Sequence, residues 1–236
     1  MNKEELRERI WDRLQTEGVA RFPYPPHGRI PNFVDASAAA ARLAEASPWT
    51  RARTVKCNPD APQLPVRRRA LRAGKTLFMA VPRLREPAPF LRIAPDEIDD
   101  IDAATTVAGA AEHGVPVAPE EMPPVDLIVA GSVAVDTAGN RVGKGEGYSD
   151  LEFGVLRAFD RVEDTTAVVS TVHQLQVVED GVISPAAHDV PLDLLVTPDR
   201  MVQTEPVSAR PAGLFWEDLT AEKIEAIPVL ERLQPR

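Results

Sequence analysis

Short, nearly continuous apolar runs are the feature that most constrains how this chain can fold. The clearest are residues 125–131 and 166–172, in which hydrophobic side chains follow one another with little polar interruption. Such runs are typical of strands buried on both faces, as in a parallel sheet covered by helices. They are too short to cross a bilayer, so we expect no membrane partner.

The first expected helix covers residues 3–17. Asn2 and Glu5 have the spacing of a capping box at its start. Apolar residues then recur every four positions from Leu6 to Leu14, which predicts an amphipathic helix with one buried face.

Strands and helices are expected to alternate along the rest of the chain. Further strands are expected at residues 54–57, 76–81, 175–178, 193–197 and 201–202. Further helices are expected at residues 36–46 (capped by Asp35 or Ser37), 66–73 (closed by Gly74), 150–159 and 216–224. This alternation predicts a single α/β domain over residues 1–236, a three-layer α/β/α sandwich around a mostly parallel sheet.

Two stretches rich in proline interrupt this pattern. Residues 19–31 are expected to form a structured loop, either a lid or a packing element. Residues 82–124 are expected to be irregular apart from a short helix near residues 105–112. The basic run at residues 67–69 is interpreted as a solvated helix face, with a phosphate or a polyglutamate tail as the alternative partner.

The composition limits the classes of partner and the compartment. The net charge of −9 argues against nucleic acid as a partner, because an acidic chain repels the phosphate backbone. Cys57 is the only cysteine, which rules out an intrachain disulfide. The charged residues Lys3, Glu4, Glu5 and Arg7 leave no apolar core for a signal peptide, so we expect a cytoplasmic protein.

The segment with the strongest chemical signal is residues 141–150, RVGKGEGYSD. Glycine alternates at Gly143, Gly145 and Gly147, which lets a ligand approach the backbone and lets consecutive amides form an anion nest. Arg141 and Lys144 add positive charge, and the segment leads into a helix N-terminus, which also favours anions. This pattern predicts a polyphosphate ligand, with charge-assisted hydrogen bonds of roughly 1.5–3 kcal/mol each.

The alternative for this segment is a glycine-rich hairpin turn between two strands. The spacing is neither that of a P-loop nor that of a dinucleotide fingerprint. The pattern by itself therefore leaves both interpretations open.

Residues 125–156, VDLIVAGSVAVDTAGNRVGKGEGYSDLEFGVL, resemble the signature of 5-formyltetrahydrofolate cyclo-ligases. In that family a buried strand leads to an AFD-like turn and then to G-x-R-L-G-x-G-x-G-Y-Y-D. A second match is HDVPLD at residues 188–193, followed by VTP at residues 196–198. Lys3 and Arg7 match the K-x-x-x-R of the family's first helix.

The chain is most similar to one branch, the methenyltetrahydrofolate-synthetase-domain-containing proteins. The segments that resemble this branch are KCNPD at 56–60, GK at 74–75, AVPRL at 80–84, GKGEGYSDLE at 143–152 and GLFW at 213–216. The resemblance therefore spans nearly the whole chain.

The resemblance implies a three-layer α/β sandwich and a reaction that uses ATP and Mg²⁺ to convert 5-formyltetrahydrofolate to 5,10-methenyltetrahydrofolate. Residues assigned to the ATP phosphates are Lys3, Arg7, Arg141, Gly143, Lys144, Gly145, Glu146, Gly147 and Tyr148. Of these, Arg141, Lys144 and Tyr148 would also act in catalysis, which for phosphoryl transfer means positioning and charge neutralisation. Asp150 and Asp189 would bind Mg²⁺, and Asp60 and Gln176 would contact the reduced folate or a similar substrate.

Structural alternatives exist for several of these residues. Lys3 and Arg7 could be solvated charges of the first helix, and Asp150 could be a helix N-cap. Asp189 could close an Asx turn, and Asp60 could cap the turn at Asn58 and Pro59. Glu146 would either bind metal or face solvent.

The chain departs from the enzyme pattern mainly in the half that would hold folate. The family's GYYDR becomes GYSDL at residues 147–151, its AFD turn becomes AVD, and its substrate glutamate becomes Asp60. Two alternative functions follow: a non-catalytic regulator that binds nucleotide or folate, and an ATP-using enzyme of the same fold with another small-molecule substrate.

Overall fold

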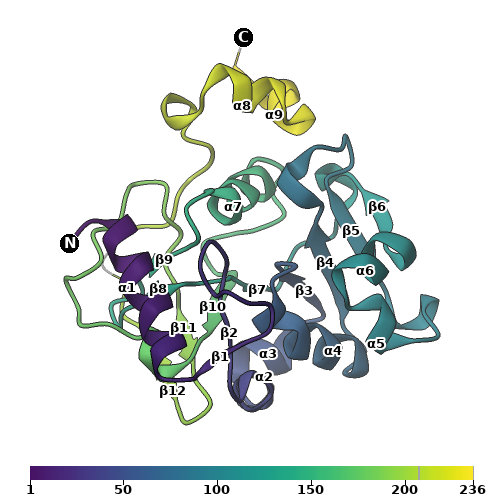
Figure 1. Cartoon of the computed structure of the whole chain (residues 1–236). Coiled ribbons are helices and arrows are strands. Elements are labelled where there is room, and N and C mark those ends of the chain that lie inside the picture. The colour runs from purple at the N-terminus through teal and green to yellow at the C-terminus, as the bar shows by residue number, and fades with distance from the viewer. Residues whose placement is uncertain (207, 236) are drawn as a thin grey trace.

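An eight-stranded sheet runs through the centre of the protein, which is described by a computed structural model over residues 1–206 and 208–235. Its strands lie in the order β12 (Met201–Gln203), β11 (Leu194–Val196), β10 (Ala167–Thr171), β7 (Leu127–Val129), β3 (Thr54–Cys57), β4 (Thr76–Ala80), β5 (Phe90–Ile93) and β6 (Val115–Val117). Neighbouring strands from β11 to β4 are parallel, whereas the pairings at the two edges are antiparallel. The expected α/β class with a mostly parallel sheet is confirmed (Figure 1).

The order of the strands reverses between β3 and β7. After β3 the chain adds β4, β5 and β6 on one side, then returns to add β7, β10, β11 and β12 on the other. In open α/β sheets, ligands bind outside the carboxyl ends of the strands at such a switch point. The topology therefore indicates a site beyond the ends of β3, β4 and β7.

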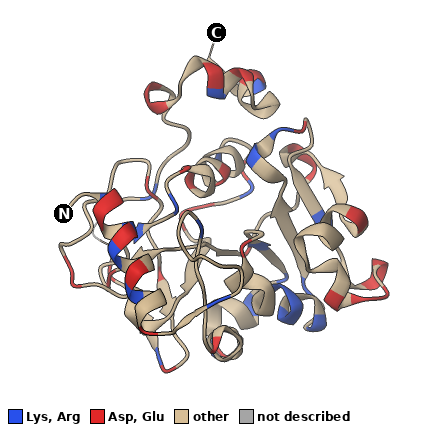
Figure 2. Cartoon of the chain, viewed as in Figure 1, with Lys and Arg blue, Asp and Glu red and all other residues tan. Residues whose placement is uncertain are grey.

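Helices cover both faces of the sheet. One face packs against α2 (Ala36–Leu43), α3 (Ser47–Arg51), α4 (Leu64–Arg72), α5 (Ile101–Ala104) and α6 (Val107–His113). The other packs against α7 (Tyr148–Ala158) and α9 (Pro228–Leu233), which is preceded by α8 (Ala221–Glu225). The amphipathic α1 (Lys3–Thr16) packs beside the hairpin of β8 (Ala134–Val135) and β9 (Arg141–Val142) (Figure 1). This helix carries charges of both signs along its length (Figure 2).

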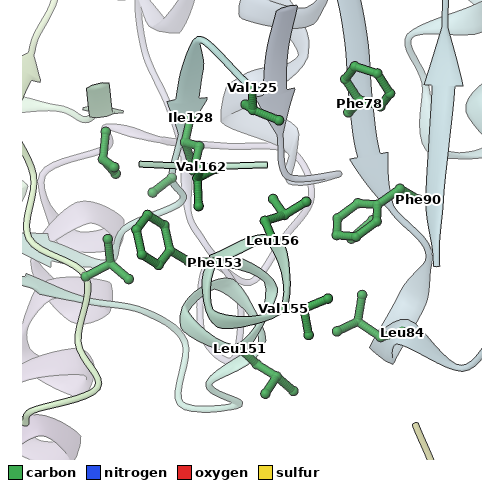
Figure 3. Packing of buried hydrophobic residues seen from close by; sticks show 14 of the residues in the cluster. Phe78, Leu84, Phe90, Val125, Ile128, Leu151, Phe153, Val155, Leu156 and Val162 are labelled. Carbon is green, nitrogen blue, oxygen red and sulfur yellow. The ribbon is translucent and has the colours of Figure 1, made fainter. Parts of the chain in front are cut away.

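Side chains of the central strands alternate between the two faces, as strand geometry requires. On β4, Phe78 faces the α7 side and Leu77 faces the α4 side. Phe153 and Leu156 of α7 project into the first of these cores, where Phe90 also lies (Figure 3). Burial on both faces explains why these strands read as continuous apolar runs in the sequence.

The expected helix starts and stops are largely confirmed. Asn2 and Glu5 form the capping box of α1. Gly74, with φ of 74°, follows the end of α4, in a conformation that favours glycine. Asp35 occupies the cap position of α2, but its side chain makes no capping hydrogen bond.

The expectation of irregular structure over residues 82–124 was wrong. This stretch contains β5, β6 and α5, in addition to α6 close to the expected short helix. Pro116 lies within β6, where proline is tolerated because β6 is at the edge of the sheet.

Two further expectations need correction. Residues 175–178 are not a strand: Gln174–Gln176 forms a 3-10 helix, and only Val177 bridges to Val135. The helix expected at residues 216–224 is a 3-10 turn at Trp216–Asp218 followed by α8 and then α9, because Thr220 caps α8 and Pro228 begins α9.

Residues 19–31 pack against α1 rather than standing apart from it. The segment is closed by the pairing of β1 (Ala20–Arg21) with β2 (Asn32–Phe33). The indole of Trp11 donates to the carbonyl oxygen of Arg29 at 3.0 Å, and the neighbouring Ile30 is buried. The remaining 3-10 helices are Ala61–Gln63, Pro82–Leu84, Pro95–Glu97 and Pro119–Glu121. Across the described ranges, none of the helices combines the length and apolar character needed to cross a bilayer.

Candidate active site

A cavity of about 290 Å³ opens at the predicted switch point of the sheet. The segments that follow β3, β4 and β7 form one side, and the glycine-rich segment with the first turns of α7 forms the other. Its lining residues include Ile30, Asn58, Asp60, Arg83, Gly131, Arg141, Gly143, Lys144, Glu146, Tyr148, Asp150 and Glu152. Most residues predicted to bind phosphate are therefore gathered at one place.

The glycine-rich segment is a loop between β9 and α7. The hairpin turn lies earlier in the chain, where Asp136 accepts hydrogen bonds from Asn140, at 2.8 Å from the backbone amide. The alternative of a glycine-rich hairpin turn is therefore wrong. Gly145 has φ of 105° and Gly147 has φ of 73°, conformations that residues with a Cβ rarely adopt.

The N-terminus of α7 faces the cavity. Gly147 occupies the cap position, so α7 begins at Tyr148, two residues before the expected start, and the alternative of Asp150 as N-cap is wrong. The first amides of a helix have no partner within it and carry partial positive charge. This helix end is therefore suited to an anionic ligand.

Arg7 reaches the loop from α1. Its Nε donates to the carbonyl oxygen of Gly143 at 2.8 Å, and its guanidinium carbon lies 3.4 Å from where a Cβ on Gly145 would stand. Lys3 forms an ion pair with Asp189 at 2.5 Å. Neither side chain is merely a solvated charge of the first helix, so that alternative is wrong for both.

Two carboxylates lie beside the loop. Asp150 pairs with the buried Arg141 at 2.5 Å and accepts from the amide of Val190 at 3.0 Å, which brings the segment after Asp189 against α7. Asp189 also accepts from the amide of Ala186 at 2.7 Å, so it closes a turn in addition to pairing with Lys3. The Nε of Arg141 is buried and has no hydrogen-bond partner among the described residues, which suits an added anion.

Asp150 lines the cavity, whereas Asp189 is not among its lining residues. A carboxylate at the position of Asp150 fits Mg²⁺ together with phosphate oxygens. Mg²⁺ is commonly held by one or two carboxylates plus substrate phosphates and water. Within residues 1–206 and 208–235, no cluster of three His, Cys, Asp or Glu side chains could hold a metal through protein ligands alone. Asp150 and Asp189 stay the predicted ligands.

Cations surround the mouth of the cavity, partly paired with Glu146. Its carboxylate lies 2.7 Å from Lys144 and 4.0 Å from Arg83, and its carbonyl oxygen accepts from Lys223 of α8 at 3.3 Å. The Lys223 ammonium also lies 5.1 Å from the ring centre of Tyr148. An anionic ligand would compete with Glu146 for these cations.

Asp60 lies on the opposite wall. Burial, reinforced by repulsion from Glu152, raises the pKa of its carboxyl to about 6, against the attraction of Lys144. It precedes a 3-10 helix, but its side chain makes no capping hydrogen bond. A Cβ on Gly131 would lie 2.7 Å from the Asp60 carboxylate, so this approach of the two segments requires glycine.

Gln176 and Arg67, which the sequence analysis also singled out, do not line the cavity. Gln176 is buried outside the cavity, where its amide binds the backbone of His173, Ser132 and Val133, and its substrate role stays a prediction. Arg67 was wrongly interpreted as solvated.

Arg67 is 1% exposed, because its guanidinium donates to the carbonyl oxygens of Asn58, Asp60 and Thr105 at 2.8–2.9 Å. It therefore holds the wall that carries Asp60. Arg69 on the same helix is exposed.

Sequence reasoning also missed four residues that belong to the site. Arg83 has φ of 59° and lines the mouth, while Asn58 and Glu152 line the floor. Lys56 lies beneath them and pairs with Glu152. The detectable signals were a lysine inside a short buried strand and a glutamate between the apolar residues Leu151 and Phe153 of α7.

Known proteins resemble this chain in sequence and in fold. The sequence profile of the 5-formyltetrahydrofolate cyclo-ligase family matches residues 1–198. The chain is 40% identical over its full length to the methenyltetrahydrofolate synthase domain-containing protein of Mus musculus and 36% identical to that of Homo sapiens. It spans 64% and 62% of the length of these two relatives.

A solved structure shares the fold. The solution structure of Aquifex aeolicus 5,10-methenyltetrahydrofolate synthetase superposes with a TM-score of 0.55 at 22% identity, over 86% of this chain and 93% of that one.

Proposed function

Because this chain belongs to the 5-formyltetrahydrofolate cyclo-ligase family, we propose that it is an ATP- and Mg²⁺-dependent enzyme that converts 5-formyltetrahydrofolate to 5,10-methenyltetrahydrofolate. The observation that carries the proposal is the convergence of the glycine loop, Lys144 and the N-terminus of α7 on one cavity. Arg7 supports this loop from α1 through the carbonyl oxygen of Gly143. That convergence supplies the positioning and charge neutralisation that phosphoryl transfer needs.

ATP would supply a phosphoryl group to the formyl oxygen, so that N10 can attack the formyl carbon and phosphate can leave. In this assignment the loop amides and Lys144 bind the phosphates, and Arg7 holds the loop in place through Gly143. Arg141 neutralises charge from beneath the loop while it orients Asp150 for Mg²⁺. Tyr148 closes the nucleotide side, and Lys3 keeps Asp189 beside it.

The first test follows methenyltetrahydrofolate by its near-ultraviolet absorbance after 5-formyltetrahydrofolate, ATP and Mg²⁺ are mixed with the protein. ATP-dependent product, lost in Asp150→Ala, is the expected result. Absence of product from protein that binds ATP would reject this reaction.

The loop assignment has its own test in ATP binding. Lys144→Ala is expected to weaken ATP binding roughly 10- to 100-fold, the effect of losing one charge-assisted hydrogen bond. The matched control is Arg69→Ala, which removes an exposed cation outside the cavity. Equal ATP affinity in all three proteins would contradict the loop assignment.

A second candidate is an ATP-using enzyme of the same fold that acts on another small molecule. The observation in its favour is the charged floor made by Lys56 and Glu152, which sets the substrate half of the cavity apart from the phosphate half. Turnover of a different acceptor, with none of 5-formyltetrahydrofolate, would support it. We also propose that residues 1–236 form one cytoplasmic domain that acts on a small molecule and not on nucleic acid.

A further inference from the structure

Lys56 is a charged residue of β3 that lies between apolar residues of the two adjoining strands. Its partners on the neighbouring strands are Phe78 of β4 and Ile128 of β7. Both partners belong to the hydrophobic core beneath α7, and Figure 3 labels Phe78 and Ile128 within it. Lys56 itself is 1% exposed.

The charge of Lys56 is balanced by Glu152 of α7, which is 4% exposed. Oε2 of Glu152 accepts from the Lys56 ammonium and from the side-chain amide of Asn58 at 3.1 Å. Asn58 is oriented in turn by the amide of Gly131, which donates to its side-chain oxygen at 3.3 Å. These contacts fix the position of one carboxylate oxygen.

The other oxygen of Glu152 has capacity left for a ligand. Among the described residues no hydrogen bond ends on Oε1, although Glu152 lines the cavity. An ionised carboxylate accepts through about four lone-pair positions, so two donors on Oε2 leave it half satisfied. An acceptor that opens on a cavity can take a hydrogen bond from a bound molecule.

Stability alone does not account for this pair. Replacing a buried ion pair by apolar residues of similar volume is often neutral or stabilising, because desolvation offsets the attraction between the charges. Here the neighbours on both strands already show that apolar residues fit the row. Glu152 lines the cavity and Lys56 pairs with it, which indicates a role of the pair in ligand binding.

We propose that Glu152, positioned by Lys56 and Asn58, accepts hydrogen bonds from the N–H groups of a flat, amino-substituted nitrogen heterocycle bound at the floor of the cavity. The carboxyl of Asp60 on the neighbouring wall offers a second acceptor to the same edge. The cations at the mouth, Lys144 and Arg83, keep the anionic part of the ligands outside this floor. The inference rests on the proposed function, because the aminopteridine ring of 5-formyltetrahydrofolate is a ligand of this class.

The test compares a single and a double variant by titration calorimetry. Glu152→Gln removes the acceptor charge but leaves Lys56 buried without its partner, so the protein is expected to lose stability. The double variant, Lys56→Met with Glu152→Leu, removes both charges and keeps the volume, so it is expected to fold. Folding is checked by circular dichroism and thermal denaturation.

The probes are 5-formyltetrahydrofolate, pterin, p-aminobenzoylglutamate as the fragment without the heterocycle, and ATP. The double variant is expected to bind 5-formyltetrahydrofolate and pterin roughly 10- to 100-fold more weakly than the wild type. Its affinity for ATP and for p-aminobenzoylglutamate should stay within about twofold. If Lys56 and Glu152 had only a structural role, the double variant would keep wild-type affinity for all four probes.

Wild-type affinity for pterin and folate in the double variant would overturn the inference, and so would failure of the wild type to bind either. The turnover assay separates this outcome from failure of the proposed reaction. A protein that binds both through Glu152 but forms no product would retain the inference and lose the reaction.

Discussion

The carboxyl of Asp60 makes the stability of this protein depend on pH in an unusual direction. Its pKa is raised from 3.8 to about 6, first because burial removes the carboxylate from water and then through repulsion by Glu152. At 1.36 kcal/mol per pKa unit, this shift corresponds to about 3 kcal/mol. Below about pH 3.8 the carboxyl is protonated in both the folded and the unfolded chain, so it imposes no penalty.

As pH rises from about 3.8 to about 6, the unfolded chain releases this proton before the folded protein does. The contribution of Asp60 to the free energy of unfolding therefore falls over that interval and is constant above it. Asp60→Asn abolishes the titration and keeps the shape of the side chain. It should be more stable than the wild type by up to about 3 kcal/mol at pH 7.5, and this difference should shrink as pH falls to about 4.

Urea denaturation of both proteins between pH 4.5 and 8 measures this difference. The matched control is Asp99→Asn, which removes an exposed carboxylate and should change the free energy of unfolding by less than about 0.5 kcal/mol. A difference for Asp60→Asn that does not grow with pH, or a less stable variant at pH 7.5, would refute the reasoning.

Three further changes test the wall, the C-terminal segment and the loop. Arg67→Met should lower the free energy of unfolding by about 2–4 kcal/mol in urea denaturation, because three backbone carbonyls lose a buried donor. The control Arg69→Met changes an exposed residue and should alter the free energy of unfolding by less than about 0.5 kcal/mol. Leu230→Ala should lower it by about 2–5 kcal/mol in the same assay, and an unchanged value would show that α9 is not part of the core. Gly145→Ala should weaken ATP binding about tenfold in calorimetry, because φ of 105° strains a residue with a Cβ by about 1–3 kcal/mol. The control Gly213→Ala should leave ATP binding unchanged, because no atom lies within 4 Å of the added Cβ.

The fold could be predicted because its strands are buried on both faces. That burial makes β7 and β10 continuous apolar runs, which are recognisable without knowledge of their neighbours. The edge strand β6 and its neighbour β5 lack this signal, and the prolines around them are typical of a loop. Which strands pair, and hence where the switch point lies, depends on contacts between distant segments that no local pattern contains.

The conformation of the glycine loop could also be predicted, because alternating glycines have a local conformational cause, whereas its role in phosphate binding stays a prediction. Gly145 and Gly147 do adopt positive φ in a loop that leads into α7. The substrate half could not be predicted in the same way. Lys56 and Glu152 are 96 residues apart, and neither segment indicates by itself that the two side chains pair.

The loop shows why net charge is a poor guide to anion binding here. The chain carries a formal charge of −9, yet Arg83 and Lys144 both line this cavity. Arg7 and Lys223 contact the loop beside it, through the carbonyl oxygens of Gly143 and Glu146. Exposed charges beyond about 8–10 Å are largely screened at physiological ionic strength, so the distant acidic residues contribute little at this point. A phosphate at the loop would respond mainly to these cations and to the amides of α7. A ligand group at the floor would instead respond to the carboxylates of Asp60 and Glu152. The cavity thus has cations at its mouth and carboxylates at its floor. In the proposed function, this division would allow one end of the site to keep a phosphate ligand while the other end changes its substrate.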